Sequence, residues 1–229
     1  MIRDPDGITI LEINAERPLN LARGWPRSYT RDRMVSALSS AVPPFPIARF
    51  SVEQYHRMIE SGAFAEDDRL ELIEGWVVQQ MAKGPGHEYA VGQGEEFLRA
   101  RVPAGWHVRN QAPITLTSSE PEPDLTIVRG DRAAYRQRHP VASEVALVVE
   151  VSDTSLTTDR IKGKAYGSAG IAEYWIINLA DRRVEVYTRP DAASDQGYAS
   201  RKTFGVNETI ALHLAGQDLG TLAVSALLP

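Results

Sequence analysis

Apolar residues in this chain gather in short runs separated by polar turns. The run at 145–151 is rich in β-branched residues, a pattern typical of a strand that is covered on both faces. A polar segment follows it, then a helix predicted over about 157–169 with Gly170 as its stop, then a second apolar run at 174–177. A strand, a helix and a strand in this order predict a crossover connection, and therefore a parallel or mixed sheet.

Hairpins and further helices are predicted around this unit. Ser51 is suited to cap a helix that reaches about residue 61, and the runs 70–73 and 76–81 flank a turn at Glu74 and Gly75. The remaining expected elements are a helix over 87–101, strands at 106–110, 113–116 and 125–128, a loop or short exposed helix over 129–140, a hairpin formed by 174–177 and 184–187, and short strands around 210–214 and 222–224. Together they predict an α/β fold in which helices flank a mixed β-sheet.

Length and composition favour one globular domain that follows an N-terminal arm. The chain has 229 residues, of which 43% are hydrophobic and 24% charged, and we place the domain at 49–229. Residues 1–48 show few apolar positions in any period and end near a cluster of prolines, which predicts an arm. The arm carries four arginines that could contact phosphate, although a solvated or partner-wrapping arm is the preferred interpretation: Arg23, Arg27, Arg31 and Arg33.

Several function classes are disfavoured by composition. No apolar run is long enough to span a bilayer, and the chain does not start with a basic segment followed by an apolar one, so we expect no membrane segment. The absence of cysteine excludes disulfides and zinc–thiolate sites and leaves the cytoplasm as the default compartment. A net charge of -5 argues against non-specific coating of nucleic acid, but it is compatible with a nuclease whose carboxylates hold a metal. No glycine-rich phosphate loop follows any predicted strand.

Candidate chemistry centres on a carboxylate inside the apolar run. Glu150 lies near the end of the strand at 145–151, where a carboxylate is costly to bury unless a cation, a metal or dense hydrogen bonding compensates it. Asp124 opens the strand at 125–128 directly after a proline turn. If the two strands are neighbours, both carboxylates converge at one side of the sheet. One or two carboxylates with substrate phosphate oxygens are sufficient to hold Mg²⁺, and a nearby lysine can orient water and stabilise charge.

These segments resemble the PD-(D/E)XK nuclease superfamily and, within it, the Uma-two family of putative restriction endonucleases. The resemblance extends over roughly 50–190 and depends on the following segments together: 71–75 (ELIEG), His87, 121–125 (PEPDL), 148–152 (VVEVS), 159–162 (DRIK), Tyr166 and 169–175 (AGIAEYW). It implies a restriction-endonuclease-like fold and a Mg²⁺-dependent phosphodiesterase acting on DNA. It also implies that Asp124 and Glu150 are metal ligands, with Glu71 as a third acidic residue that joins the metal and catalytic set.

The chain departs from the superfamily pattern at Ser152, where a lysine is expected two residues after the second acid. Strand alternation places Ser152 on the same face as Glu150, so the position fits but the charge is missing. In similar members of the family the lysine lies in the following helix, and Lys162 matches it by its spacing to Tyr166. Lys164 competes for this role, but Asp159, Lys162 and Tyr166 share one helical face, which favours Lys162.

Each candidate also has a structural interpretation. Glu150 could be an ion-pair partner, Asp124 a turn residue, and Glu71 a solvent-facing residue of an alternating strand. His87 is interpreted as a residue at the helix start or on the surface rather than as a catalytic base. Accordingly, the alternative function is a catalytically inactive nuclease fold that binds nucleic acid or protein. A homodimer is expected because cutting both strands of a duplex needs two sites, with the arm and the edge of the late hairpin (175–187) as candidate surfaces.

Overall fold

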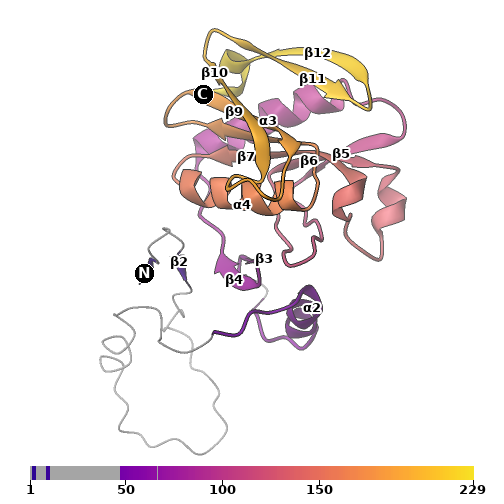
Figure 1. Cartoon of the computed structure of the whole chain (residues 1–229), viewed down its shortest axis with the longest axis vertical. Coiled ribbons are helices and arrows are strands. Elements are labelled where there is room, and N and C mark those ends of the chain that lie inside the picture. The colour runs from indigo at the N-terminus through magenta and orange to yellow at the C-terminus, as the bar shows by residue number, and fades with distance from the viewer. Residues whose placement is uncertain (1, 4–8, 11–46, 66) are drawn as a thin grey trace, which may run out of the picture.

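A six-stranded mixed sheet forms the centre of the computed structural model, which describes residues 2–3, 9–10, 47–65 and 67–229. The strand order is β10-β9-β8-β7-β6-β5 (Figure 1). The strands are β5 (Trp106–Asn110), β6 (Leu125–Arg129), β7 (Val145–Ser152), β8 (Glu173–Asn178), β9 (Arg183–Pro190) and β10 (Tyr198–Gly205). Only β7 and β8 run parallel in this sheet; every other neighbouring pair is antiparallel. The predicted α/β fold with a mixed sheet is confirmed.

Helix α4 (Leu156–Ser168) makes the crossover between the two parallel strands. It ends where predicted, because Gly170 adopts a left-handed φ of 84° that glycine accepts without strain. In this conformation the amides of Gly170 and Ile171 bond back to the carbonyls of Gly167 and Tyr166. The chain therefore leaves the helix directly into β8, and the face of α4 that packs on the sheet is fixed.

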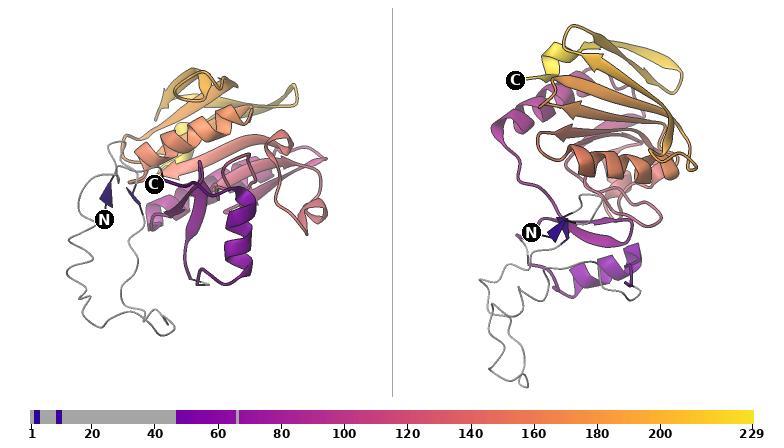
Figure 2. Two further views of the ribbon diagram at one scale, coloured as in Figure 1. Left: turned by 60° about the horizontal axis from the view of Figure 1, so that its bottom comes forward. Right: turned by 60° about the vertical axis from the view of Figure 1, so that its left-hand side comes forward.

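The sheet is covered on both faces, as Figure 2 shows from the side. One face carries α3 (Pro85–Arg99), the hairpin of β11 (Thr209–Leu214) and β12 (Gln217–Ala223), and the short η3 (Val224–Leu227). The other face carries α4. Strand alternation divides β7 accordingly: Leu147, Val149 and Val151 face α3, whereas Val148 faces α4. Glu150, in phase with Val148, also lies on the α4 side.

A smaller unit lies below the α4 side in Figure 1. It consists of α2 (Val52–Glu60), β3 (Leu70–Ile73) and β4 (Trp76–Gln79), packed around Tyr55, Leu72 and Val77. Ser51 caps α2 through a reciprocal capping box with Gln54, as the sequence predicted. The two strands turn at Glu74 and Gly75, both with positive φ, as a two-residue hairpin requires. A bridge between Leu72 and Glu120 joins this unit to the segment that precedes β6.

Several local predictions need correction. Residues 113–116 form no strand, because their backbone bonds go to a loop and to an isolated bridge between Thr115 and Val141. The basic stretch contains η1 (Arg132–Tyr135), and η2 (Ala142–Glu144) leads into β7. The late hairpin has no free edge, because the unpredicted strand β10 pairs with β9, so that edge is not a dimer surface.

At the start of the chain, the structure describes two short paired strands, β1 (Ile2–Arg3) and β2 (Thr9–Ile10). The arginines assigned to the predicted arm lie outside the described residues. Within the described part of the chain, no helix has both the length and the apolar character needed to cross a membrane.

Candidate active site

Asp124 and Glu150 meet at one end of the sheet. Strands β6 and β7 are antiparallel neighbours with Leu125 opposite Val149, so Asp124, the residue before β6, lies beside Glu150 of β7. The Asp124 amide donates to Glu150 Oε2 at 3.4 Å, and the Val151 amide donates to Asp124 Oδ2 at 2.8 Å. Both side chains are 3% exposed. The structure thus brings together the two carboxylates that the sequence placed on neighbouring strands.

Glu71 reaches the same place from β3. Its Oε2 accepts a hydrogen bond from the Glu122 amide at 3.1 Å, and its Oε1 lies 2.8 Å from Lys162 Nζ. The side chain is buried, so the solvent-facing alternative is wrong. The small hairpin unit therefore contributes one carboxylate to a site that is otherwise built on the main sheet.

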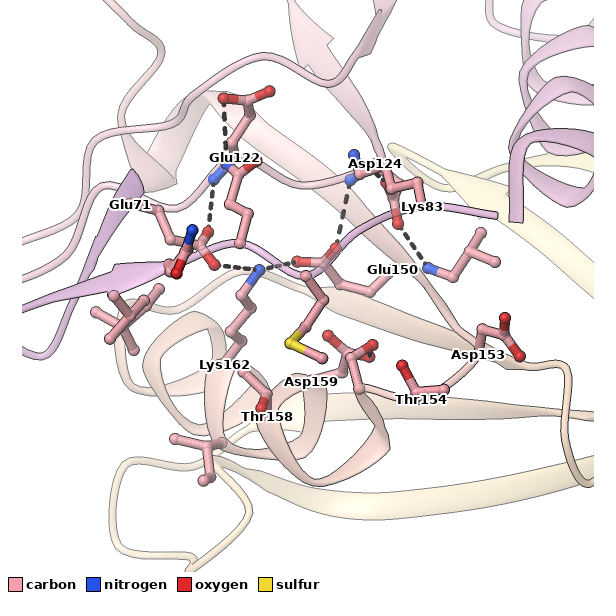
Figure 3. Close-up of a pocket in the computed structure, with 18 of the residues that line it drawn as sticks. Glu71, Lys83, Glu122, Asp124, Glu150, Asp153, Thr154, Thr158, Asp159 and Lys162 are labelled. Atoms are coloured by element: carbon pink, nitrogen blue, oxygen red, sulfur yellow. Dashed lines mark hydrogen bonds and ion pairs between the residues drawn. The ribbon is translucent and has the colours of Figure 1, made fainter. Parts of the chain in front are cut away.

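Lys162 lies between two carboxylates, as the dashed lines in Figure 3 show. Its Nζ is 2.8 Å from Glu71 Oε1 and 3.4 Å from Glu150 Oε1. Tyr166, one turn later on α4, donates its hydroxyl to Glu150 Oε1 at 2.8 Å. Lys164 is exposed at the rim of the same pocket. Of the two competing lysines, only Lys162 contacts the carboxylates.

Two residues that the sequence did not assign to the site hold Asp124. Lys83 Nζ lies 3.0 Å from Asp124 Oδ1, and His87 Nε2 lies 3.0 Å from Oδ2. His87 is 6% exposed, which corrects its interpretation as a surface residue. Its burial could have been read from its place beside Ala90 and Val91 on the apolar face of α3. Nothing in the sequence indicates the Lys83 contact, because the loop before α3 meets Asp124 only in the folded chain.

Burial sets the protonation of the acidic groups. It raises the pKa of Glu150 from 4.5 to about 8, with Asp124, Asp159 and Glu71 adding to the rise and Lys162 opposing it. It likewise raises the pKa of Asp159 from 3.8 to about 6. For Asp124, burial is outweighed by the His87 hydrogen bond and the Lys83 charge, and its pKa falls.

The pKa of the Lys162 ammonium is set by two opposing effects, its burial and the neighbouring carboxylates. Burial alone would lower its pKa, but the carboxylates of Glu150, Glu71 and Asp159 raise it above the ordinary value. Lys162 therefore stays protonated at neutral pH. It can offset negative charge and donate hydrogen bonds, but it cannot accept a proton.

These side chains form the floor of an open pocket of about 440 Å³. Asp153, Thr154 and Thr158 line its wall near the start of α4 (Figure 3). Carboxylates, an ammonium and hydroxyls around one opening suit a phosphorylated ligand that arrives with a cation. Seven carboxyl side chains line the pocket against three ammonium groups and one guanidinium, so acidic groups outnumber basic ones there.

The donor set fits a magnesium ion. Among the described residues, no three His, Cys, Asp or Glu side chains already form a metal-binding cluster. Asp124 and Glu150 nevertheless line the same pocket with hard carboxylate oxygens, and Mg²⁺ keeps most of its waters, so two carboxylates with substrate oxygens are sufficient. The pKa of Glu150 is raised because Lys162 does not fully offset its burial and the nearby acidic groups. A divalent cation would supply the missing positive charge.

Comparisons with known proteins identify the family of the chain and a related fold. The model of the Uma2 family, described as a putative restriction endonuclease, matches residues 52–225, well over half the chain. A solved structure with the same fold is that of a putative nuclease belonging to DUF820 from Anabaena variabilis, with a TM-score of 0.56 and 14% sequence identity. The alignment covers 80% of this chain and 97% of that one. No curated protein matches the chain.

Proposed function

Because the chain belongs to the Uma2 family of putative restriction endonucleases, we propose that it is a Mg²⁺-dependent endonuclease that hydrolyses phosphodiester bonds of DNA. The observation that carries the proposal is the convergence of Asp124, Glu150 and Lys162 on the floor of one open pocket. The proposal assigns Asp124 and Glu150 as metal ligands, with Glu71 as the third acidic residue of the site.

Each side chain has a distinct task in this scheme. Asp124 and Glu150 bind the cation, and Mg²⁺ held there would lower the pKa of a bound water and offset charge on the scissile phosphate. Glu71 positions the Lys162 ammonium and keeps it protonated. Lys162 in turn orients the attacking water or a phosphate oxygen and offsets the charge that builds up during attack. Lys83 and His87 hold the Asp124 carboxylate in place.

One observation favours the alternative, a catalytically inactive nuclease fold. Ser152 is buried at the strand position where the superfamily pattern has a lysine, and a hydroxyl carries no charge. The Lys162 ammonium, however, lies 3.4 Å from Glu150, so a cation is present although it comes from the helix. We therefore retain the catalytic assignment, which an activity assay can decide.

The test is nicking of supercoiled plasmid DNA with and without Mg²⁺. We expect the wild type to cleave only with the metal, and Glu150→Gln, which keeps the shape of the side chain, to lose activity by about a hundredfold or more. Glu96→Gln, an exposed carboxylate on α3, is the matched control and should cleave like the wild type. Equal cleavage by the wild type and folded Glu150→Gln would rule out the assigned site, and absence of cleavage by the wild type would favour the inactive alternative.

A further inference from the structure

A second, basic hollow lies at the edge of the sheet between β5 and η1, beside the short helical turns at the right of Figure 1. Its volume is about 410 Å³. The described residues that line it are Arg99, His107, Arg109, Asn110, Ala112, Arg132 and Tyr135, none of which is acidic. Glu95, outside the lining, pairs with Arg99 and accepts a hydrogen bond from Asn110. Arg109 and Arg132 form no ion pair with a described carboxylate, so the hollow keeps two guanidinium charges without a paired anion.

Arg109 is the innermost charge of this hollow. Its Nη1 donates to the Pro113 carbonyl at 3.1 Å, and its guanidinium lies 5.9 Å from the centre of the Tyr135 ring. No described carboxylate forms an ion pair with it. Burial lowers its pKa, and the charge of Arg132 lowers it further. A half-buried guanidinium beside a like charge is costly unless an anion compensates it. An anionic ligand bound in the hollow would therefore stabilise Arg109.

The walls of the hollow are held in place by backbone hydrogen bonds. Tyr135 donates its hydroxyl to the Arg129 carbonyl at 2.6 Å, and His107 Nδ1 lies 2.6 Å from the Gly130 carbonyl. The two rings contact each other with their centres 5.7 Å apart. Because these bonds go to the end of β6 and to the turn that follows it, the aromatic wall is fixed before any ligand arrives. A preorganised site loses less entropy on binding than a flexible basic surface does.

The hollow lies at the sheet edge, and the part formed by His107 and Arg109 is on the same side of the sheet as the candidate active site. Val108 packs toward α3, so His107 and Arg109 point to the α4 side, where Asp124 and Glu150 also lie. Arg109 pairs with Thr126, and the Gln111 amide bonds to the Asp124 carbonyl at 3.0 Å. Asp124 is two residues from Thr126, which lies opposite Arg109 on the neighbouring strand. The Cα atoms of Arg109 and Asp124 are therefore roughly 8 Å apart.

We infer that this hollow, formed by Arg109, Arg132 and Tyr135, binds a backbone phosphate of DNA that flanks the phosphate to be cut. Arginine matches a phosphate with a fork of donors, and the aromatic wall can stack on an adjacent sugar or base. A strand carries one phosphate per about 3.4 Å of helix rise, so the two sites would contact phosphates only a few nucleotides apart. The inference rests on the proposed function, since it assumes that DNA occupies the active site.

Binding of a fluorescein-labelled DNA duplex, followed by anisotropy over a KCl series in EDTA, tests this site without cleavage. We expect the double variant Arg109→Gln/Arg132→Gln to bind about tenfold more weakly. The slope of log K against log[KCl] should be smaller in magnitude by about one to two. Arg132→Gln alone changes an exposed side chain and should lower that slope by about one, even if the Arg109 change disturbs folding.

The matched control is Arg182→Gln/Lys202→Gln, which removes two exposed charges near the opposite edge of the sheet and should leave the slope unchanged. A wild type that binds DNA while the hollow variants keep its slope, or lose no more than the control, would overturn the phosphate site and leave the proposed nuclease standing. A wild type that binds no duplex would overturn the phosphate site, and the plasmid assay with Mg²⁺ would then decide the proposed function separately.

Discussion

At the scale of single residues, the site is organised by Glu150, whose two oxygens contact groups from α4 and from the segment before β6. Tyr166 and Lys162 of α4 contact Oε1, and the amide of Asp124 approaches Oε2. Burial disfavours the ionised form of this carboxylate, whereas Lys162 favours it. The balance leaves Glu150 protonated near neutral pH in the metal-free chain, so metal binding would release a proton.

We predict that the metal-free protein loses stability as the pH rises from about 5 to about 8. The pKa of Glu150 is raised to about 8 and that of Asp159 to about 6, so the folded chain holds protons that the unfolded chain has released. Their stabilising contribution is complete below about pH 4 and is lost as the pH passes the folded pKa values. Thermal unfolding of the wild type and Glu150→Gln checks this. The variant should show a shallower decline, and identical declines would contradict the raised pKa of Glu150.

The sequence was informative about the acids and poorly informative about their partners. A carboxylate within a β-branched run is unusual by itself and can be recognised in the sequence. The helical spacing of Asp159, Lys162 and Tyr166 involves only neighbouring turns, so it can be recognised there too. Lys83 and His87 reach Asp124 across 41 and 37 positions of the chain. Such contacts depend on how α3 and its preceding loop lie on the sheet, which no local pattern encodes.

At the scale of elements, α4 approaches the sheet closely because glycines line its inner face. A Cβ on Gly163 would come within 2.8 Å of the Tyr174 ring, and one on Gly167 would collide with the backbone of Gly197. This close approach places Lys162 where its ammonium reaches Glu71 and Glu150. The helix therefore positions the cation of the site through its backbone packing.

We predict that Gly167→Ala destabilises the fold by about 1–3 kcal/mol, because the new methyl group would force α4 away from the loop at Gly197. Gly92→Ala on α3 is the control: nothing lies within 4 Å of its Cβ position, so it should stabilise by about 0.5–1 kcal/mol through helix propensity. Chemical denaturation measures both variants. Equal effects in the two would contradict the packing that we describe.

Elements with a strong apolar period were predicted well, and polar ones were not. Strands β7 and β8 follow from their apolar patterns, because each is buried over most of its length, whereas helix α4 was located by the polar segment before it and by Gly170. Strand β10 was missed because its middle residues are mostly exposed and polar, so pairing with β9 rather than side-chain burial defines it. The apolar residues Ile114 and Leu116 suggested a strand, but they pack into the core from a loop.

At the scale of the whole molecule, one chain offers one site, whereas a duplex has two strands to cut. We therefore predict a symmetric dimer in solution at micromolar concentration. Light scattering coupled to size exclusion measures the mass directly. A mass of 25.3 kDa, that of one chain, both with and without duplex DNA would contradict this prediction.

The chain also joins two units at the site, since Glu71 comes from the small hairpin unit and Glu150 and Lys162 from the main body. Lys162 connects them, which makes it the residue on which the account most depends. Its protonated ammonium is assigned to offset charge on the scissile phosphate, and Lys164, two residues on, is exposed and contacts neither carboxylate.

The most direct measurement is therefore Mg²⁺-dependent cleavage of plasmid DNA by Lys162→Met and by its matched control Lys164→Met. Methionine keeps much of the volume of lysine but removes its charge and its N–H donors, and circular dichroism verifies that both variants fold. We predict that Lys162→Met loses a factor of about a hundred to a thousand in rate while Lys164→Met cleaves like the wild type. Equal cleavage by the wild type and folded Lys162→Met, or a loss confined to Lys164→Met, would contradict the account.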